Sequence, residues 1–179
     1  MDPRETLLTI AEISIAVIGF AGIVSALRPR TSFLADAMHR LRMRIMLETA
    51  AYVLVIAFFP LLLSGLDLAE TVIWSLGSGL LAITAPIQVA SIYMRQRSIF
   101  GSALLRETIL FDASTIALAF AVEAALIANA LGLFFRPGFA GYLIGVLFPL
   151  WAAVAMFVRA ILASEELVFP NREESPPRD

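Results

Sequence analysis

Three carboxylates lie inside long apolar stretches of this chain, at Glu12, Glu48 and Glu123. If those stretches cross a membrane, a charged side chain at the centre costs about 2.5–3.5 kcal/mol on insertion scales, so it must face protein or water. A carboxylate in such a place can attract a cation, exchange a proton or hydrogen-bond a neighbouring helix. These three groups are the first candidates for chemistry in the sequence.

Glu12 belongs to a stripe of residues at helical spacing. Its face continues through Thr9 and Glu5 in one direction and through Gly19 and Ile23 in the other. Glu12 is expected about 9 Å from the outer end of its apolar segment, at ~1.5 Å per residue. A polar end that leads to a small and then an apolar end predicts the lining of a water-filled path. The alternative is that Glu12 hydrogen-bonds a neighbouring helix.

The other two carboxylates differ in depth. Glu48 lies one helical turn after Arg44, which predicts an ion pair at the level of the membrane surface. Glu123 is expected about 15 Å deep, near the middle of the bilayer. Two interpretations of Glu123 remain open: a neutral carboxyl that hydrogen-bonds another helix, or a group that handles protons or cations. Gln88, on a polar stripe of its segment, and Asn129, on a different helical face from Glu123, complete the predicted set of buried polar residues.

Five apolar segments carry these residues. They cover positions 6–27, 45–64, 71–94, 113–135 and 139–162. About 20 residues rising ~1.5 Å each cross a hydrocarbon core of ~30 Å, and every segment reaches that length. Hydrophobic residues make up 60% of the chain, above the ~45–50% of soluble domains. The sequence therefore predicts an all-α, polytopic integral membrane protein with five transmembrane helices.

The distribution of arginine predicts the orientation. All 13 basic residues are arginine, and only Arg4 and Arg136 lie on one side of the predicted membrane. The eleven on the other side are Arg28, Arg30, Arg40, Arg42, Arg44, Arg95, Arg97, Arg106, Arg159, Arg172 and Arg178. Because cytoplasmic loops carry the excess of basic residues, we expect the N-terminus outside and the C-terminus in the cytoplasm. A bacterial inner membrane is the default location.

Amphipathic stretches lie beside the predicted spans. Residues 31–45 and 98–111 place apolar side chains at helical spacing and predict short helices on the cytoplasmic surface. Arginines 28, 30, 40, 42 and 44 are expected to bind anionic lipid headgroups, at about 1 kcal/mol each; the alternative is that they only determine topology. Residues 1–169 form one transmembrane domain, and the polar tail 170–179 has the composition of a disordered segment.

Short connections and small residues predict close packing near the C-terminus. The connections 64–70 and 136–138 are short enough for tight antiparallel hairpins. Gly141 and Gly145 form a G-x-x-x-G pair, which lets two helix backbones approach each other in a membrane. We expect this pair to pack within the chain.

The composition excludes several kinds of chemistry. The chain has no lysine for a Schiff base, no cysteine for a thiolate site, and a single histidine, His39. No glycine motif for phosphate binding occurs. We therefore expect no enzyme, no cofactor and no metal. The expected partners are membrane lipids and further copies of the chain, with other membrane subunits as a second possibility and no nucleic acid.

These features lead to one functional expectation and two alternatives. The expectation is a homo-oligomeric channel or pore subunit that conducts cations, with the first span lining the axis, since rings of identical carboxylates favour cations. The first alternative is a non-catalytic subunit or scaffold of a larger membrane complex. The second is a small proton-linked carrier that uses Glu123.

Overall fold

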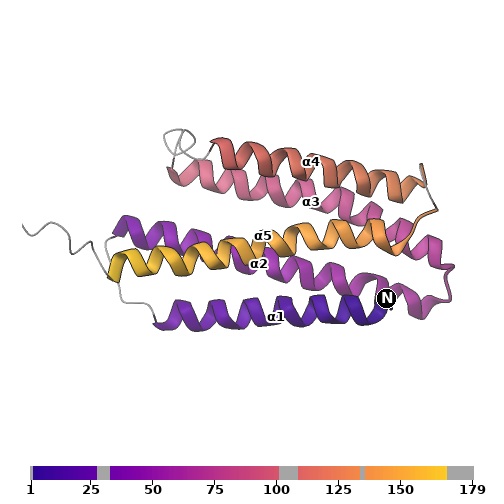
Figure 1. Cartoon of the computed structure of the whole chain (residues 1–179), viewed down its shortest axis with the longest axis horizontal. Coiled ribbons are helices and arrows are strands. Elements are labelled where there is room, and N and C mark those ends of the chain that lie inside the picture. The colour runs from indigo at the N-terminus through magenta and orange to yellow at the C-terminus, as the bar shows by residue number, and fades with distance from the viewer. Residues whose placement is uncertain (1, 28–32, 101–108, 134–135, 169–179) are drawn as a thin grey trace, which may run out of the picture.

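The computed structural model describes residues 2–27, 33–100, 109–133 and 136–168 (Figure 1). Five α-helices fill almost all of these ranges: α1 Pro3–Leu27, α2 Phe33–Leu63, α3 Glu70–Phe100, α4 Ile109–Leu131 and α5 Phe139–Val168. A short 3₁₀ turn, η1 Ser64–Leu66, follows α2. No strand occurs in the described ranges, which confirms the all-α prediction.

The helices run along one common direction, and α1 lies at an edge of the bundle (Figure 1). α1 packs mainly against α2 and also touches α5. At the opposite edge α4 packs on α3 and α5, while α2 and α5 form the centre. One face of α1 is therefore turned inward, and the rest of its surface meets the surroundings of the bundle.

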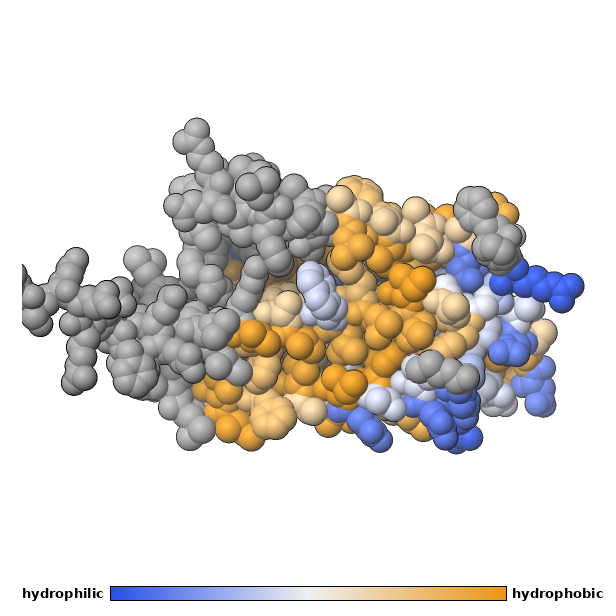
Figure 2. All heavy atoms as spheres, in the orientation of Figure 1, coloured by the Kyte–Doolittle hydropathy of each residue, from blue (hydrophilic) through white to orange (hydrophobic). Residues whose placement is uncertain are grey.

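Four of the helices contain segments long and apolar enough to cross a membrane, namely Pro3–Val24, Met43–Leu66, Glu70–Arg95 and Phe139–Val158. Within the described part of α4 the apolar segment Ala117–Leu131 is shorter. A broad hydrophobic band covers the visible face, and hydrophilic side chains gather at the end that holds the N-terminus (Figure 2). Large apolar side chains such as Leu62 and Phe120 are 71% and 72% exposed. These observations indicate a membrane protein, because lipid can cover such a band and water cannot.

The interior of the bundle is apolar and forms two clusters. The larger cluster draws on every helix and consists of Leu7, Ile10, Ala11, Val53, Ile56, Ala57, Trp74, Leu81, Leu126, Tyr142, Val146 and Leu150. The smaller joins α1, α2 and α5 through Val17, Ala21, Met43, Met46, Ala50 and Ala153. Two buried hydroxyls, those of Ser14 and Thr49, donate to the carbonyl oxygens one turn earlier, both at 2.8 Å. Burial of these hydroxyls therefore leaves neither proton without an acceptor.

Both predicted hairpins are present. The first runs from α2 through η1 to α3, and Asp67 adopts the left-handed conformation there with φ 52°. The second begins at Gly132, which ends α4 with φ 64°. The amide of Gly132 donates to the Asn129 carbonyl at 3.3 Å and the amide of Leu133 donates to the Ala128 carbonyl at 3.0 Å. This is the Schellman pattern, in which a glycine with positive φ satisfies the last carbonyls of a helix.

The first amphipathic stretch is continuous with a long helix. The stretch 31–45 runs into the second span as expected, because α2 begins at Phe33 and continues without a break. Of the second stretch, residues 98–100 belong to the end of α3 and residues 109–111 to the start of α4, while residues 101–108 lie outside the described residues.

Some of the predictions fall on parts of the chain outside the described residues. These are the positions of Arg28 and Arg30 and the tail 170–179.

The G-x-x-x-G pair brings α5 against α4. A Cβ added at Gly141 would lie 2.4 Å from the Asn129 Cγ, and one at Gly145 would lie 2.4 Å from a methyl carbon of Leu126. Both distances are far below van der Waals contact, so the helices can pack this closely only because both positions are glycine. The prediction that this pair packs within the chain is confirmed.

Gly141→Ala should therefore loosen the α4–α5 contact. We expect the free energy of unfolding to fall by about 1–3 kcal/mol relative to a matched variant, because overpacking forces the backbones apart. The matched variant is Gly79→Ala in α3, where an added Cβ would meet only the Ala130 Cβ at an ordinary 3.9 Å. Denaturation of the purified protein in mixed detergent micelles, followed by tryptophan fluorescence, measures both. Equal stabilities of the two variants would contradict the packing.

Candidate functional site

The stripe predicted along the first span lies on the outward face of α1. Glu5, Thr9, Glu12, Gly19 and Ile23 are all exposed. The inward face of α1 is formed by other residues, among them Leu7, Ile10, Ser14, Val17 and Ala21, which are buried. The stripe therefore points away from the bundle, and a Cβ added at Gly19 would meet no atom within 4 Å.

Glu12 is the member of this stripe that is least compatible with a lipid environment. The helix begins at Pro3, so Glu12 lies close to the middle of the candidate span Pro3–Val24. Hydrophilic side chains interrupt the hydrophobic band of Figure 2 along its lower edge, where α1 lies. Lipid cannot solvate a carboxylate at this depth. Glu12 therefore requires water or another polar surface that the single chain does not supply.

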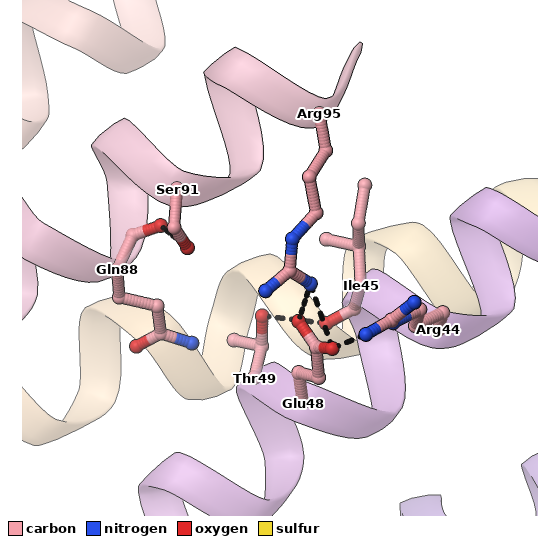
Figure 3. A network of polar contacts seen from close by, with 7 residues as sticks. All are labelled: Arg44, Ile45, Glu48, Thr49, Gln88, Ser91 and Arg95. Atoms are coloured by element: carbon pink, nitrogen blue, oxygen red, sulfur yellow. Dashed lines mark hydrogen bonds and ion pairs between the residues drawn. The ribbon is translucent and has the colours of Figure 1, made fainter. Parts of the chain in front are cut away.

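Glu48 lies in an ion-pair network between α2 and α3 (Figure 3). Arg44 Nε donates to Glu48 Oε1 at 2.8 Å, which confirms the predicted pair within α2. Arg95 Nη1, from α3, lies 2.7 Å from Oε1 and 2.5 Å from Oε2 of the same carboxylate. One carboxylate thus accepts from two arginines and ties the two helices together.

The energy of this network is modest. The side chain of Glu48 is 35% exposed, and those of Arg44 and Arg95 are 65% and 39% exposed. Exposed pairs of this kind contribute about 0.2–1 kcal/mol each, since water screens them. The network is therefore better suited to fixing the register of α2 against α3 than to holding the bundle together.

A second polar contact joins α2 to α3 deeper in the bundle. The hydroxyls of Tyr52 and Thr84 are 2.7 Å apart. Thr84 also donates to the carbonyl of Leu80 at 2.8 Å. A hydroxyl carries a single proton, so Tyr52 must be the donor in the bond to Thr84.

A third contact joins α2 to α5, and its cause is a proline. Pro60 has no N–H, so the carbonyl of Ile56, one turn earlier, loses its usual partner in the helix. The hydroxyl of Tyr142 donates to this carbonyl. Tyr142 is fully buried, and Gly77 leaves room for its ring, because a Cβ there would lie 2.9 Å from Tyr142 Cε2. Sequence analysis missed this contact, although the proline alone indicates a carbonyl in need of a donor.

Asn129 stabilises the α4–α5 hairpin through hydrogen bonds. Its Oδ1 accepts from the Gly138 amide at 3.1 Å, and its Nδ2 donates to the Gly138 carbonyl at 3.1 Å. Nδ2 also lies 2.7 Å from the hydroxyl of Ser78 in α3. The role of Asn129 is thus structural, and it joins three helices at one end of the bundle.

Glu123 stands apart from these networks. It lies on α4, is partly exposed, and among the described residues no side chain forms an ion pair or hydrogen bond with it. Gln88 is also partly exposed and lies beside the Glu48 network without joining it (Figure 3). All four residues predicted as buried polar, Glu48, Gln88, Glu123 and Asn129, are partly exposed rather than buried.

The predicted lipid-binding arginines are only partly described. Arg40 and Arg44 are exposed on α2, and Arg44 is engaged with Glu48. Arg42 belongs to the same helix, but its side chain lies outside the described set, as do Arg28 and Arg30. The structure thus places the stripe on α1, the Glu48 network and Glu123 at three separate positions.

Comparison with known proteins adds no relative to this picture. No model of a known protein family matches the chain, and no curated protein and no solved structure matches it. In the described part of the chain, no three His, Asp or Glu side chains are grouped so that they could hold a metal ion.

The link between Pro60 and Tyr142 can be tested by a double-mutant cycle. Tyr142→Phe should lower the free energy of unfolding by about 1–3 kcal/mol, since it leaves a buried carbonyl unsatisfied. In a Pro60→Ala background the restored amide at position 60 can donate to the Ile56 carbonyl, so the same substitution should cost much less. Denaturation in mixed micelles measures all four proteins. A loss from Tyr142→Phe that is the same in both backgrounds would contradict the proposed link.

Proposed function

We propose that this protein is the subunit of a homo-oligomeric channel that conducts cations, with α1 lining the axis. The single observation that carries the proposal is the exposed Glu12 near the middle of the span Pro3–Val24. A carboxylate there cannot remain against lipid. In a ring of identical chains related by rotational symmetry, neighbouring copies would cover the stripe of each chain and enclose water beside it. The exposed carboxylates would then line a water-filled path.

The residues of the stripe have suitable chemistry for such a path. Glu5 at the outer end and Glu12 near the middle of the span would form rings of negative charge, which attract cations and repel anions. Gly19 and Ile23 would form a narrower apolar segment further along. Arg28 and Arg30, which follow α1 in the sequence, would lie at the inner mouth.

The proposed channel crosses a bacterial inner membrane with five spans. α4 would be the fifth, since its 23 residues equal a rise of about 35 Å, enough for the hydrocarbon core. The excess of arginine at one end supports an external N-terminus and a cytoplasmic C-terminus.

Reporter fusions at the two termini test this topology. With five spans the termini lie on opposite sides, so an alkaline phosphatase fusion should be active only at the N-terminus and a fluorescent-protein fusion should mature only at the C-terminus. Charge reversal of the arginines between α1 and α2 should weaken the preference for an external N-terminus. Both termini on one side would rule out five spans.

Another function is consistent with the same face of α1. A non-catalytic subunit of a larger membrane complex would also need an exposed polar stripe, since Glu12 could hydrogen-bond a helix of a different protein. The two functions differ in what covers the stripe: copies of this chain around water, or an unrelated helix.

Glu12→Gln tests the channel directly. The amide keeps size and hydrogen-bonding capacity, so assembly should persist, but the ring of charge is lost. We expect the cation-to-anion permeability ratio, measured from reversal potentials in planar bilayers, to fall by roughly tenfold, near the lower end of electrostatic focusing effects. Asp67→Asn is the matched control, since it removes an exposed carboxylate from the α2–α3 hairpin and not from α1.

Two outcomes would overturn the channel proposal. One is a wild-type protein without conductance across voltage, pH and calcium concentration. The other is a protein that native mass spectrometry finds as a monomer or bound to unrelated chains, which would favour the subunit of a larger complex.

A further inference from the structure

A groove lies at the N-terminal end of the bundle, between the start of α1 and the end of α2 with η1. In Figure 1 the labelled N-terminus lies beside the α2–α3 connection, where this groove is found. Its volume is about 370 Å³, within the ~300–1,000 Å³ of small-molecule sites. The groove is separate from the stripe on α1, because Glu5, Thr9 and Glu12 do not line it.

Both walls of the groove change from polar to apolar in the same direction. On α1, Arg4 lies at the start of the first candidate span, and Leu8 follows one turn deeper. On the other wall, Ser64 lies near the end of the second candidate span, and Leu62 and Phe58 lie deeper along α2. Since α1 and α2 are antiparallel neighbours, the polar residues of both walls meet at one end. The groove therefore has a polar end at the membrane surface and an apolar end toward the membrane centre.

The apolar part of the groove is open to lipid. Leu8, Phe58 and Leu62 are 37%, 41% and 71% exposed, although all three lie within candidate spans. Hydrocarbon is what surrounds such a surface inside a membrane. An acyl chain can lie along these three side chains and cover them.

The polar part of the groove presents a cation. Of the described residues that line the groove, Arg4 alone is charged. It is exposed, and no described carboxylate forms an ion pair with its guanidinium. The Asp2 carboxylate instead accepts from the backbone amide of Arg4 at 2.9 Å. The hydroxyl of Ser64 donates to the Leu61 carbonyl at 2.7 Å, so Arg4 supplies the donors at this end. A guanidinium matches the geometry of a phosphate, to which it can donate two parallel hydrogen bonds.

We propose that this groove binds a phospholipid, with the phosphate on Arg4 and one acyl chain along Leu8, Phe58 and Leu62. The order of the lining residues is the order of the parts of a lipid in a leaflet, with the charged group at the surface and the hydrocarbon toward the centre. The site lies at the end of the bundle opposite Arg40 and Arg44, where the sequence predicted headgroup binding.

Native mass spectrometry of the purified protein, released from detergent micelles, measures the phosphate contact. The probe is phosphatidylglycerol, whose single charge is its phosphate, and the comparison ligand is diacylglycerol with the same acyl chains. We expect Arg4→Gln to weaken the binding of phosphatidylglycerol by roughly fivefold, the effect of one basic residue at a charged lipid surface. The same variant should leave the binding of diacylglycerol unchanged. Arg136→Gln is the matched control, since it removes an exposed arginine that lies outside the groove.

Leu8→Trp tests the apolar part of the groove. The larger side chain should occupy the space of the acyl chain and weaken the binding of both lipids several-fold. Ile15→Trp is its control, because Ile15 is 55% exposed on the same helix and does not line the groove. In liposomes, phosphatidylglycerol with a diazirine in one acyl chain should crosslink to the peptides that contain Leu8 and Phe58.

Two results would overturn the proposal. One is an equal affinity of Arg4→Gln and Arg136→Gln for phosphatidylglycerol, because the phosphate would then not lie on Arg4. The other is a wild-type protein whose crosslinks spread evenly over exposed apolar side chains such as Phe120 of α4, since lipid would then surround the bundle without a site. The crosslinks decide the proposal even if a variant fails to fold. Both measurements report binding rather than conductance, so neither depends on whether α1 lines a channel.

Discussion

A polar group inside a membrane must find its partner within the protein, and α2 meets this constraint at three successive turns. Glu48, Tyr52 and the carbonyl of Ile56 follow one another at intervals of four residues and so lie on one helical face. They bind Arg95, Thr84 and Tyr142 respectively. These contacts fix α2 against α3 and α5, the helices through which α4 is attached to the bundle. The apolar clusters supply packing, but the polar contacts define register, because apolar surfaces can slide in lipid without losing burial.

At the edge of the bundle formed by α1, the polar residues are arranged differently. α1 is attached through an inward face of apolar and small residues, and its polar residues point outward. A chain selected only for stability would gain by replacing Glu12 with an apolar side chain, since lipid penalises the carboxylate and no partner within the chain offsets this. The proposed assembly would account for the position of Glu12, because it supplies a covering surface that the described chain does not. Glu48, which has its partners at hand, needs no such explanation.

The sequence predicted where the helices lie better than it predicted which helices contact one another. Hydropathy and length found the apolar helices, the spacing of Arg44 and Glu48 predicted their pair, and Gly141 with Gly145 predicted a close approach of helices. These signals are local. The Arg95–Glu48 and Tyr52–Thr84 contacts join residues 47 and 32 positions apart, so they depend on which helices are adjacent. Amphipathicity alone does not show where a longer helix ends, so the sequence did not predict that α3 continues to Phe100.

Glu12 and Glu123 share one property that separates them from Glu48, Asn129, Tyr52 and Tyr142. Within the described chain, Glu48, Asn129, Tyr52 and Tyr142 each have a partner with good geometry, whereas neither Glu12 nor Glu123 has an ion pair or a hydrogen bond to its carboxyl. The two groups also differ from each other. Glu12 is exposed on the outward face of α1, while Glu123 is partly exposed on α4. The exposed carboxylate of Glu12 is the group on which the proposed channel depends, because repeated negative charge around an axis would attract cations.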